Sequence, residues 1–79
     1  MMKKVKSMVG KMKSTERTKL LNLLNKGKSS DLTKIPGIGT ERAANLSKGR
    51  PYKVVEEVAN ITGFGEKRIA DMIKHAKTL

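Results

Sequence analysis

The strongest constraint on this chain is an internal repeat: residues 31–48 and 57–74 follow one pattern when Asp31 is aligned with Glu57. The shared positions are Ile35, Gly37, Gly39, Arg42, Ala44 and Lys48 in the first copy, and Ile61, Gly63, Gly65, Arg68, Ala70 and Lys74 in the second. Each copy has an apolar residue, a glycine, a second apolar residue and a second glycine, followed by a polar stretch. Because such a repeat is one supersecondary unit, the sequence predicts a tight turn leading into a helix, formed twice.

The glycine pairs predict turns that another molecule can approach closely. Glycine reaches positive φ without strain and has no side chain to block a neighbour, so at Gly39 we expect either positive φ or close contact with a ligand. The apolar residue between the glycines, Ile38 or Phe64, is predicted to pack between the flanking helices. A helix start carries unpaired N–H groups and the positive end of the helix dipole. The backbone near Thr40 and Glu66 is therefore predicted to bind anions such as phosphate.

These residues resemble the helix-hairpin-helix motif, and two copies joined by a short connector resemble the tandem helix-hairpin-helix domain. The resemblance runs from about Leu23 to Ala76. Within it, Leu24-Asn25, then Ser30-Asp31-Leu32 and IPGIG, are similar to bacterial DNA-uptake proteins and to the C-terminal DNA-binding domain of the chromokinesin Kid. The resemblance implies an all-α, SAM-like small helical domain. It also implies that each hairpin binds the phosphates of one strand across the minor groove through main-chain amides, largely without reading bases.

Carried onto this chain, the resemblance assigns DNA contacts to hairpins at 36–39 and 62–65 and to basic side chains that follow them. The predicted DNA-binding residues are Gly37, Ile38, Gly39, Thr40, Arg42, Lys48, Gly63, Gly65, Glu66, Lys67, Arg68 and Lys74. Glu66 stands where the first copy has Thr40, and a carboxylate at a helix start can itself occupy an anion site. We therefore expect the first hairpin to bind phosphate more strongly than the second.

The charge of the chain favours a polyanionic partner. Eighteen Lys and Arg residues against seven Asp and Glu residues give a net charge of +11 in 79 residues, which is typical of nucleic-acid-binding proteins. The aromatic residues are Tyr52 and Phe64, too few for the stacking platforms of single-strand binders. Double-stranded DNA is therefore the expected partner.

Two parts are expected: a basic N-terminal arm over 1–13 and a tandem helix-hairpin-helix domain over 14–79. The arm holds five lysines and no acid. Four of its apolar residues recur at helical spacing, namely Met1, Val5, Met8 and Met12. That spacing suits an amphipathic helix that binds a membrane surface, whereas Gly10 and the lysines also suit a flexible, partly helical arm. The flexible arm is our preferred interpretation.

The rest of the chain predicts helices and no strand. Helices are expected over 15–26, from Ser30 to Ile35, from Thr40 to Gly49, through 54–61, and after the second hairpin up to Ala76. Their apolar positions recur at spacings of three and four residues, which is the period of an amphipathic helix. These faces are expected to form one core together with Ile38 and Phe64.

Cysteine is absent from the chain, which removes disulfides and thiolate metal sites. No apolar run approaches the roughly 20 residues that span a membrane. We expect no metal site, no cofactor and no membrane span. An intracellular, DNA-associated location is expected, in a nucleoid, a nucleus or a virion.

Catalysis is not expected from the sequence. Some DNA glycosylases and lyases have a hairpin resembling IPGIGTERAANL, with a nucleophilic lysine two residues after the second glycine. That position is Glu41 in the first copy and Lys67 in the second. A Schiff-base lysine needs burial or a nearby cation to lower its pKa, and the sequence indicates no pocket that would supply either. No catalytic residue is predicted.

The predicted function is binding of duplex DNA without sequence specificity, through hairpin amides, Lys and Arg side chains and the basic tail. Two alternatives stay open: a protein-interaction or dimerisation module of a DNA-processing complex, and a small DNA-packaging protein. Fold alone does not decide between them. Because lysine is depleted at the centres of protein interfaces, the basic residues around the hairpins favour DNA; they are Lys34, Arg42, Lys48, Lys67, Arg68 and Lys74.

Overall fold

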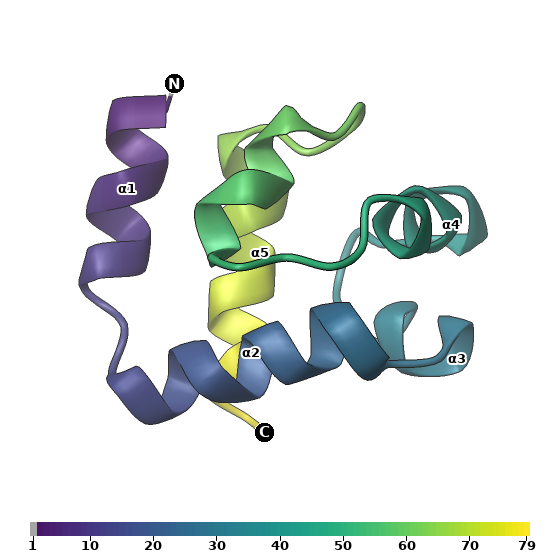
Figure 1. The fold of residues 1–79 in the computed structure, drawn as a ribbon, viewed down its shortest axis with the longest axis horizontal. Coiled ribbons are helices and arrows are strands. Elements are labelled where there is room, and N and C mark those ends of the chain that lie inside the picture. Colours follow the sequence, from purple (N-terminus) through teal and green to yellow (C-terminus); the bar gives the residue numbers. More distant parts are fainter. Residues whose placement is uncertain (1) are drawn as a thin grey trace.

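Every regular element of the structure is helical. The computed structural model describes residues 2–79, and the chain in that range forms no strand (Figure 1). The elements in chain order are α1 (Met2–Gly10), α2 (Ser14–Lys26), α3 (Ser29–Leu32), α4 (Thr40–Lys48), the 3-10 helix η1 (Val55–Asn60) and α5 (Glu66–Ala76). The all-α fold expected from the sequence is confirmed.

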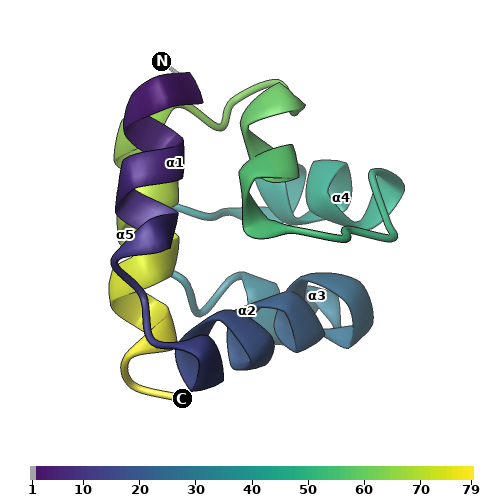
Figure 2. The ribbon, with the colours of Figure 1, turned by 60° about the vertical axis from the view of Figure 1, so that its left-hand side comes forward.

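The helices form two layers. Figure 2 shows α1 and α5 along one side of the molecule and α2, α3, α4 and η1 on the other. Helix α2 contributes Leu20 and Leu24 to the core between the layers, both fully buried, with Leu21 and Leu23 partly buried against it. It ends at Lys26, and the N–H of the next residue, Gly27, donates to the Leu23 carbonyl at 2.7 Å.

The sequence repeat is also a repeat in structure. The first copy forms α3, a turn at residues 35–39 (the first turn) and α4, and the second forms η1, a turn at residues 61–65 (the second turn) and α5. Repeat-equivalent positions are buried in pairs: Leu32 with Val58, Ile38 with Phe64, Ala43 with Ile69, and Leu46 with Met72. One hydrophobic core therefore takes the same set of positions from both copies.

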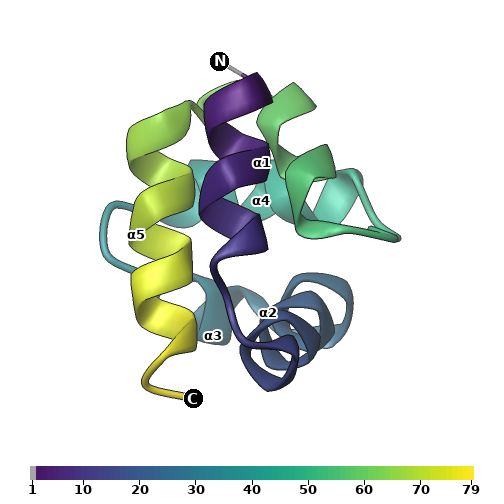
Figure 3. The same ribbon diagram turned by 90° about the vertical axis from the view of Figure 1, so that its left-hand side faces the viewer.

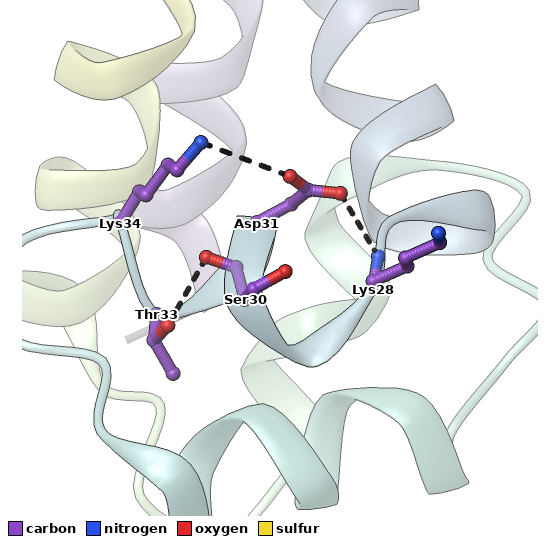
Figure 4. Close-up of polar contacts among 5 residues, drawn as sticks. All are labelled: Lys28, Ser30, Asp31, Thr33 and Lys34. Carbon is purple, nitrogen blue, oxygen red and sulfur yellow. Dashed lines mark hydrogen bonds and ion pairs between the residues drawn. The ribbon is translucent and has the colours of Figure 1, made fainter.

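A carboxylate stabilises the start of the first helical segment in each copy. Asp31 Oδ2 accepts the Lys28 N–H at 3.2 Å, as Figure 4 shows together with the Lys34–Asp31 ion pair. Its repeat equivalent, Glu57, accepts the N–H groups of Val54 at 3.0 Å and Lys53 at 2.6 Å. These backbone hydrogen bonds lower the pKa of Glu57 because they favour the charged carboxylate.

The segment expected as a helix through 54–61 is a short 3-10 helix. Val54 precedes it and is 47% exposed, while Val55 and Val58 are buried. β-Branched side chains are stiff and crowd an α-helix, and 3-10 geometry is common in short connecting pieces. The valines that suggested a helix face therefore supply two core contacts from one short segment.

The connector between the copies is held against α2. The Arg50 guanidinium donates to the carbonyls of Leu24 and Gly27. Asn25 and Tyr52 exchange two hydrogen bonds, Tyr52 N–H to Asn25 Oδ1 at 2.6 Å and Asn25 Nδ2 to the Tyr52 carbonyl at 2.9 Å. The Tyr52 hydroxyl donates to the Leu46 carbonyl at 2.7 Å, and burial raises the pKa of this phenol.

The N-terminal segment differs from the preferred interpretation as a flexible arm. Helix α1 runs beside α5 in the same direction (Figure 3), and Val5 and Val9, with Met12 just beyond the helix, are at most 5% exposed. Residues four apart lie on one helix face, so this stripe meets η1 and α5 while the lysines face outward. The apolar face of α1 thus packs into the same core as the repeat.

Within residues 2–79 no helix is both long enough and apolar enough to cross a lipid bilayer.

Candidate nucleic-acid interface

The two turns have the same backbone conformation. Gly37 and Gly63, the first glycines, have φ of 83° and 92°. Gly39 and Gly65, the second glycines, are extended, with φ and ψ of −94° and −173° at Gly39 and −87° and −172° at Gly65. We had considered positive φ for Gly39, but it occurs two residues earlier, at Gly37. Only the first glycine of each turn requires glycine for its backbone angle.

The residue between the two glycines of each turn is buried, and its N–H forms the hydrogen bond that closes the turn. The Ile38 N–H donates to the Ile35 carbonyl at 3.0 Å, and the Phe64 N–H donates to the Ile61 carbonyl at 3.1 Å. Ile38 is 4% exposed and Phe64 2% exposed. Ile38, which the sequence placed among the DNA contacts, has its amide and its side chain occupied within the protein and instead supports the turn.

The second glycines precede helix starts whose amides are accessible. The first helical hydrogen bonds run from Ala43 N–H to the Gly39 carbonyl at 2.9 Å and from Ile69 N–H to the Gly65 carbonyl at 3.1 Å. The amides before them have no acceptor within the helix, and neither glycine cap supplies one. A Cβ built on Gly39 or Gly65 meets nothing within 4 Å. Both helix starts are thus open to an anion.

Each repeat arginine contacts the turn of the other copy. Arg42 of α4 donates from Nε to the Gly63 carbonyl at 3.2 Å. Arg68 of α5 lies beside Gly37, where an added Cβ would be 3.3 Å from its Cδ, and its Nη1 is 3.8 Å from Asp71 Oδ2. This reciprocal arrangement is that of an approximate two-fold relation, in which each turn lies next to the arginine of the other copy.

The surroundings of the two turns differ in charge and in solvent exposure. Thr40 and Glu41 at the start of α4 are exposed. Glu66 at the start of α5 is half-buried, and its Oε2 lies 3.7 Å from Lys4 Nζ of α1. The carboxylate that we expected to compete with phosphate at the second turn thus faces a lysine from α1.

The remaining predicted contacts do not all gather at the turns. Lys67 is exposed in the first turn of α5. Lys48 and Lys74 lie eight residues beyond Thr40 and Glu66, which is about 12 Å along a helix axis. Lys74 lines a groove between α1 and α5 instead. The crossed contacts of Arg42 and Arg68 were not apparent in the sequence, although the repeat alignment had already paired these two residues.

A hollow of about 230 Å³ lies where α4 meets the second turn, lined by Glu41, Arg42, Asn45, Thr62 and Gly63. Among the described residues no group of three or more His, Asp or Glu side chains converges as a metal site would require.

Comparison with known proteins adds one relative. No protein-family model matches this chain, and no solved structure gives a significant match. A deoxyribonuclease from Thioalkalivibrio sp. (strain K90mix) is 37% identical over 49 residues, which cover 62% of this chain and 14% of the relative. The chain thus spans about one seventh of that protein's length.

This similarity corrects one expectation from the sequence. We expected that the chain is not an enzyme, because Glu41 replaces the lysine of glycosylases and lyases in the first copy and the sequence indicates no pocket that would activate Lys67 in the second. The relative is a deoxyribonuclease, so the expectation does not stand and is withdrawn.

Proposed function

We propose that this chain binds duplex DNA without sequence specificity, with the amides at the starts of α4 and α5 donating to backbone phosphates. The observation that carries the proposal is the repeated turn: each of two helix starts follows an open glycine, and the arginine of each copy lies next to the turn of the other. A helix N-terminus favours anions through its amides and its dipole. Two such sites fit two phosphate groups.

The approximate two-fold relation favours a duplex as the partner. The strands of a duplex are antiparallel, so protein elements related by a two-fold axis match them one to one. Amide contacts to phosphate fix position and carry no base information, which is the basis for proposing non-specific binding. The net charge of +11 supports attraction to DNA over a wide surface.

The resemblance and the relative point to the same partner. We propose that residues 23–76 form a tandem helix-hairpin-helix unit, with Gly39 and Thr40 providing the stronger phosphate site and Gly65 and Glu66 the weaker one. The deoxyribonuclease is named for action on DNA, which supports DNA as the partner of this chain too. Because the match covers 14% of that protein, cleavage is measured separately from binding.

The test is a fluorescence-anisotropy titration with duplex DNA, single-stranded DNA and double-stranded RNA of equal length at several salt concentrations. We expect duplex DNA to bind most tightly and unrelated duplexes to agree within about tenfold. For about four to eight neutralised phosphates, log K should fall against log salt with a slope of about −4 to −7. A slope near zero, or a strong preference for one sequence, contradicts the proposal. The same samples with Mg²⁺ and supercoiled plasmid report any nicking.

A further inference from the structure

The groove between α1 and α5 is a second surface with its own chemistry. It holds about 220 Å³ and is lined by Met8, Lys11, Met12, Ala70, Ile73, Lys74 and Lys77. It lies along the two parallel helices that Figure 3 shows side by side. Apolar side chains form its floor, where Met12 and Ile73 are at most 9% exposed and Met8 is half-buried. Lys74 lies on α5, while Lys11 and Lys77 are the residues that directly follow α1 and α5.

The groove is electropositive. None of its lining residues is acidic, and among the described residues no ion pair involves Lys11, Lys74 or Lys77. The acids of α5 face elsewhere, Glu66 toward Lys4 and Asp71 toward Arg68. Three lysine charges therefore surround an apolar floor without a carboxylate of the described chain to neutralise them.

We propose that this groove docks an acidic segment of a partner protein, with one or two apolar side chains of the segment on the methionines and its carboxylates on the lysines. The volume is below the roughly 300–1,000 Å³ of pockets for small molecules, so it suits side chains rather than a free metabolite. Methionine adapts its shape and is frequent at surfaces that accept different partners. The site is separate from the turns and does not rest on DNA binding.

Charge and shape favour this occupant over the others. Phosphate contacts to DNA need basic groups but no apolar floor. A second copy of this chain would bring another +11 charge to the same lysines, which is repulsive. A bilayer surface takes up apolar side chains that protrude from a helix face, whereas Met12 and Ile73 lie at the bottom of a groove.

The test uses a labelled synthetic peptide of glutamates with two leucines at i and i+4, and a control peptide in which serines replace the leucines. Two variants of the protein form a matched pair. Ala70→Glu adds a carboxylate inside the groove and one turn before Lys74, where it can pair with that lysine. Ala44→Glu makes the same change at the repeat-equivalent position on α4, which is also exposed.

We expect the leucine peptide to bind the parent and Ala44→Glu within about twofold, and Ala70→Glu at least about tenfold more weakly, because like charges across an interface are strongly unfavourable. The serine peptide should bind at least about tenfold more weakly than the leucine peptide, because it has no apolar side chain to bury on the methionines. Thermal melts check that both variants fold. Lys77→Gln removes one charge at an exposed position and should weaken binding of the leucine peptide by about threefold.

Three results would overturn the proposal. In the first, the serine peptide binds as tightly as the leucine peptide, or Ala44→Glu loses as much affinity as Ala70→Glu. In the second, duplex DNA loses more affinity in Ala70→Glu than in Ala44→Glu, which assigns the lysines to the DNA interface. In the third, the parent protein does not bind the peptide but does bind phosphatidylserine vesicles, and Ala70→Glu abolishes the vesicle binding. That result assigns the groove to a membrane surface.

Discussion

The first and second turns have one backbone geometry and two environments. Gly37 and Gly63 share positive φ, and each turn contacts the arginine of the other copy. At the first turn the start of α4 faces solvent, whereas at the second turn α1 lies beside α5 and brings Lys4 to Glu66. A local pattern of glycine and apolar residues is therefore sufficient to repeat a backbone, while the access of an anion depends on what packs next to it.

The difference originates in α1, whose buried stripe packs against η1 and α5, the two helices of the second copy. Helix α4 packs instead against α2 and α3. The second site thus has a carboxylate with a lysine beside it, and the first site has an exposed threonine. This comparison predicts that the first turn dominates phosphate binding.

Loss of a buried side chain of α1, the helix that packs on the second copy, should have the largest effect on stability. Val5→Ala deletes methyl groups from a fully buried side chain of α1 and should lower the free energy of unfolding by about 2 kcal/mol. Val54→Ala, the same change at a position that is 47% exposed, should stay within about 0.5 kcal/mol. Urea denaturation measures both. Equal and small losses would mean that α1 does not pack as described.

Alanine at each glycine of the first turn separates backbone strain from access. Gly37→Ala places a Cβ at φ of 83° and should destabilise the fold by about 1–2 kcal/mol. Gly39→Ala has extended angles and open space, so its unfolding free energy should change by less than about 0.5 kcal/mol. Thermal and urea unfolding of the two variants test this. A larger loss at Gly39 would contradict the geometry of the turn.

Charge changes at the helix starts should move duplex affinity in opposite directions. Thr40→Asp keeps a residue that favours helix starts but repels phosphate, so affinity should fall about fivefold, or about 1 kcal/mol, with stability unchanged. Glu66→Thr removes a carboxylate and releases Lys4, which should tighten binding by about two- to fivefold. Thr18→Asp, an exposed site on α2, is the control for added charge. If Thr18→Asp weakens binding as much as Thr40→Asp, the effect reflects net charge alone.

Low pH should lower the stability of the fold through protonation of Glu57 in the second copy. Its pKa is lowered from the usual 4.5 by hydrogen bonds from the Val54 and Lys53 amides. A depressed pKa in the folded state stabilises the fold above the unfolded value and loses that stabilisation as pH falls through the folded value. Stability should therefore decline below about pH 4.5, and the stability of Glu57→Gln should decline less steeply over the same pH range. Parallel pH profiles for the two proteins would refute this role.

The fold was predictable where the signal is local. The glycine pairs predicted both turns, and apolar spacing predicted α2, α4 and α5 because these helices each bury one face. Which glycine has positive φ was not predictable, because both positions accept any backbone angle. The packing of α1 was missed because its valines meet η1 and α5, which are distant in sequence.

The candidate site was predictable in position but not in detail. The repeat located both helix starts, which the structure leaves open. It also predicted that Ile38 packs into the core, as the structure has it, but it did not indicate that Lys74 lies in a groove with α1. The crossed arginines depend on how the two copies face each other, a tertiary relation that no pattern within one copy specifies.

The most direct measurement of the central claim is a titration of ¹⁵N-labelled protein with duplex DNA, followed through the backbone amide signals. The account predicts that the largest shifts occur at Gly39, Thr40 and Glu41, that smaller shifts occur from Gly65 to Lys67, and that Ile38, whose amide is already bonded within the turn, changes little. Shifts confined to α1 and α2, with both helix starts unchanged, would show that the turns do not bind the DNA backbone.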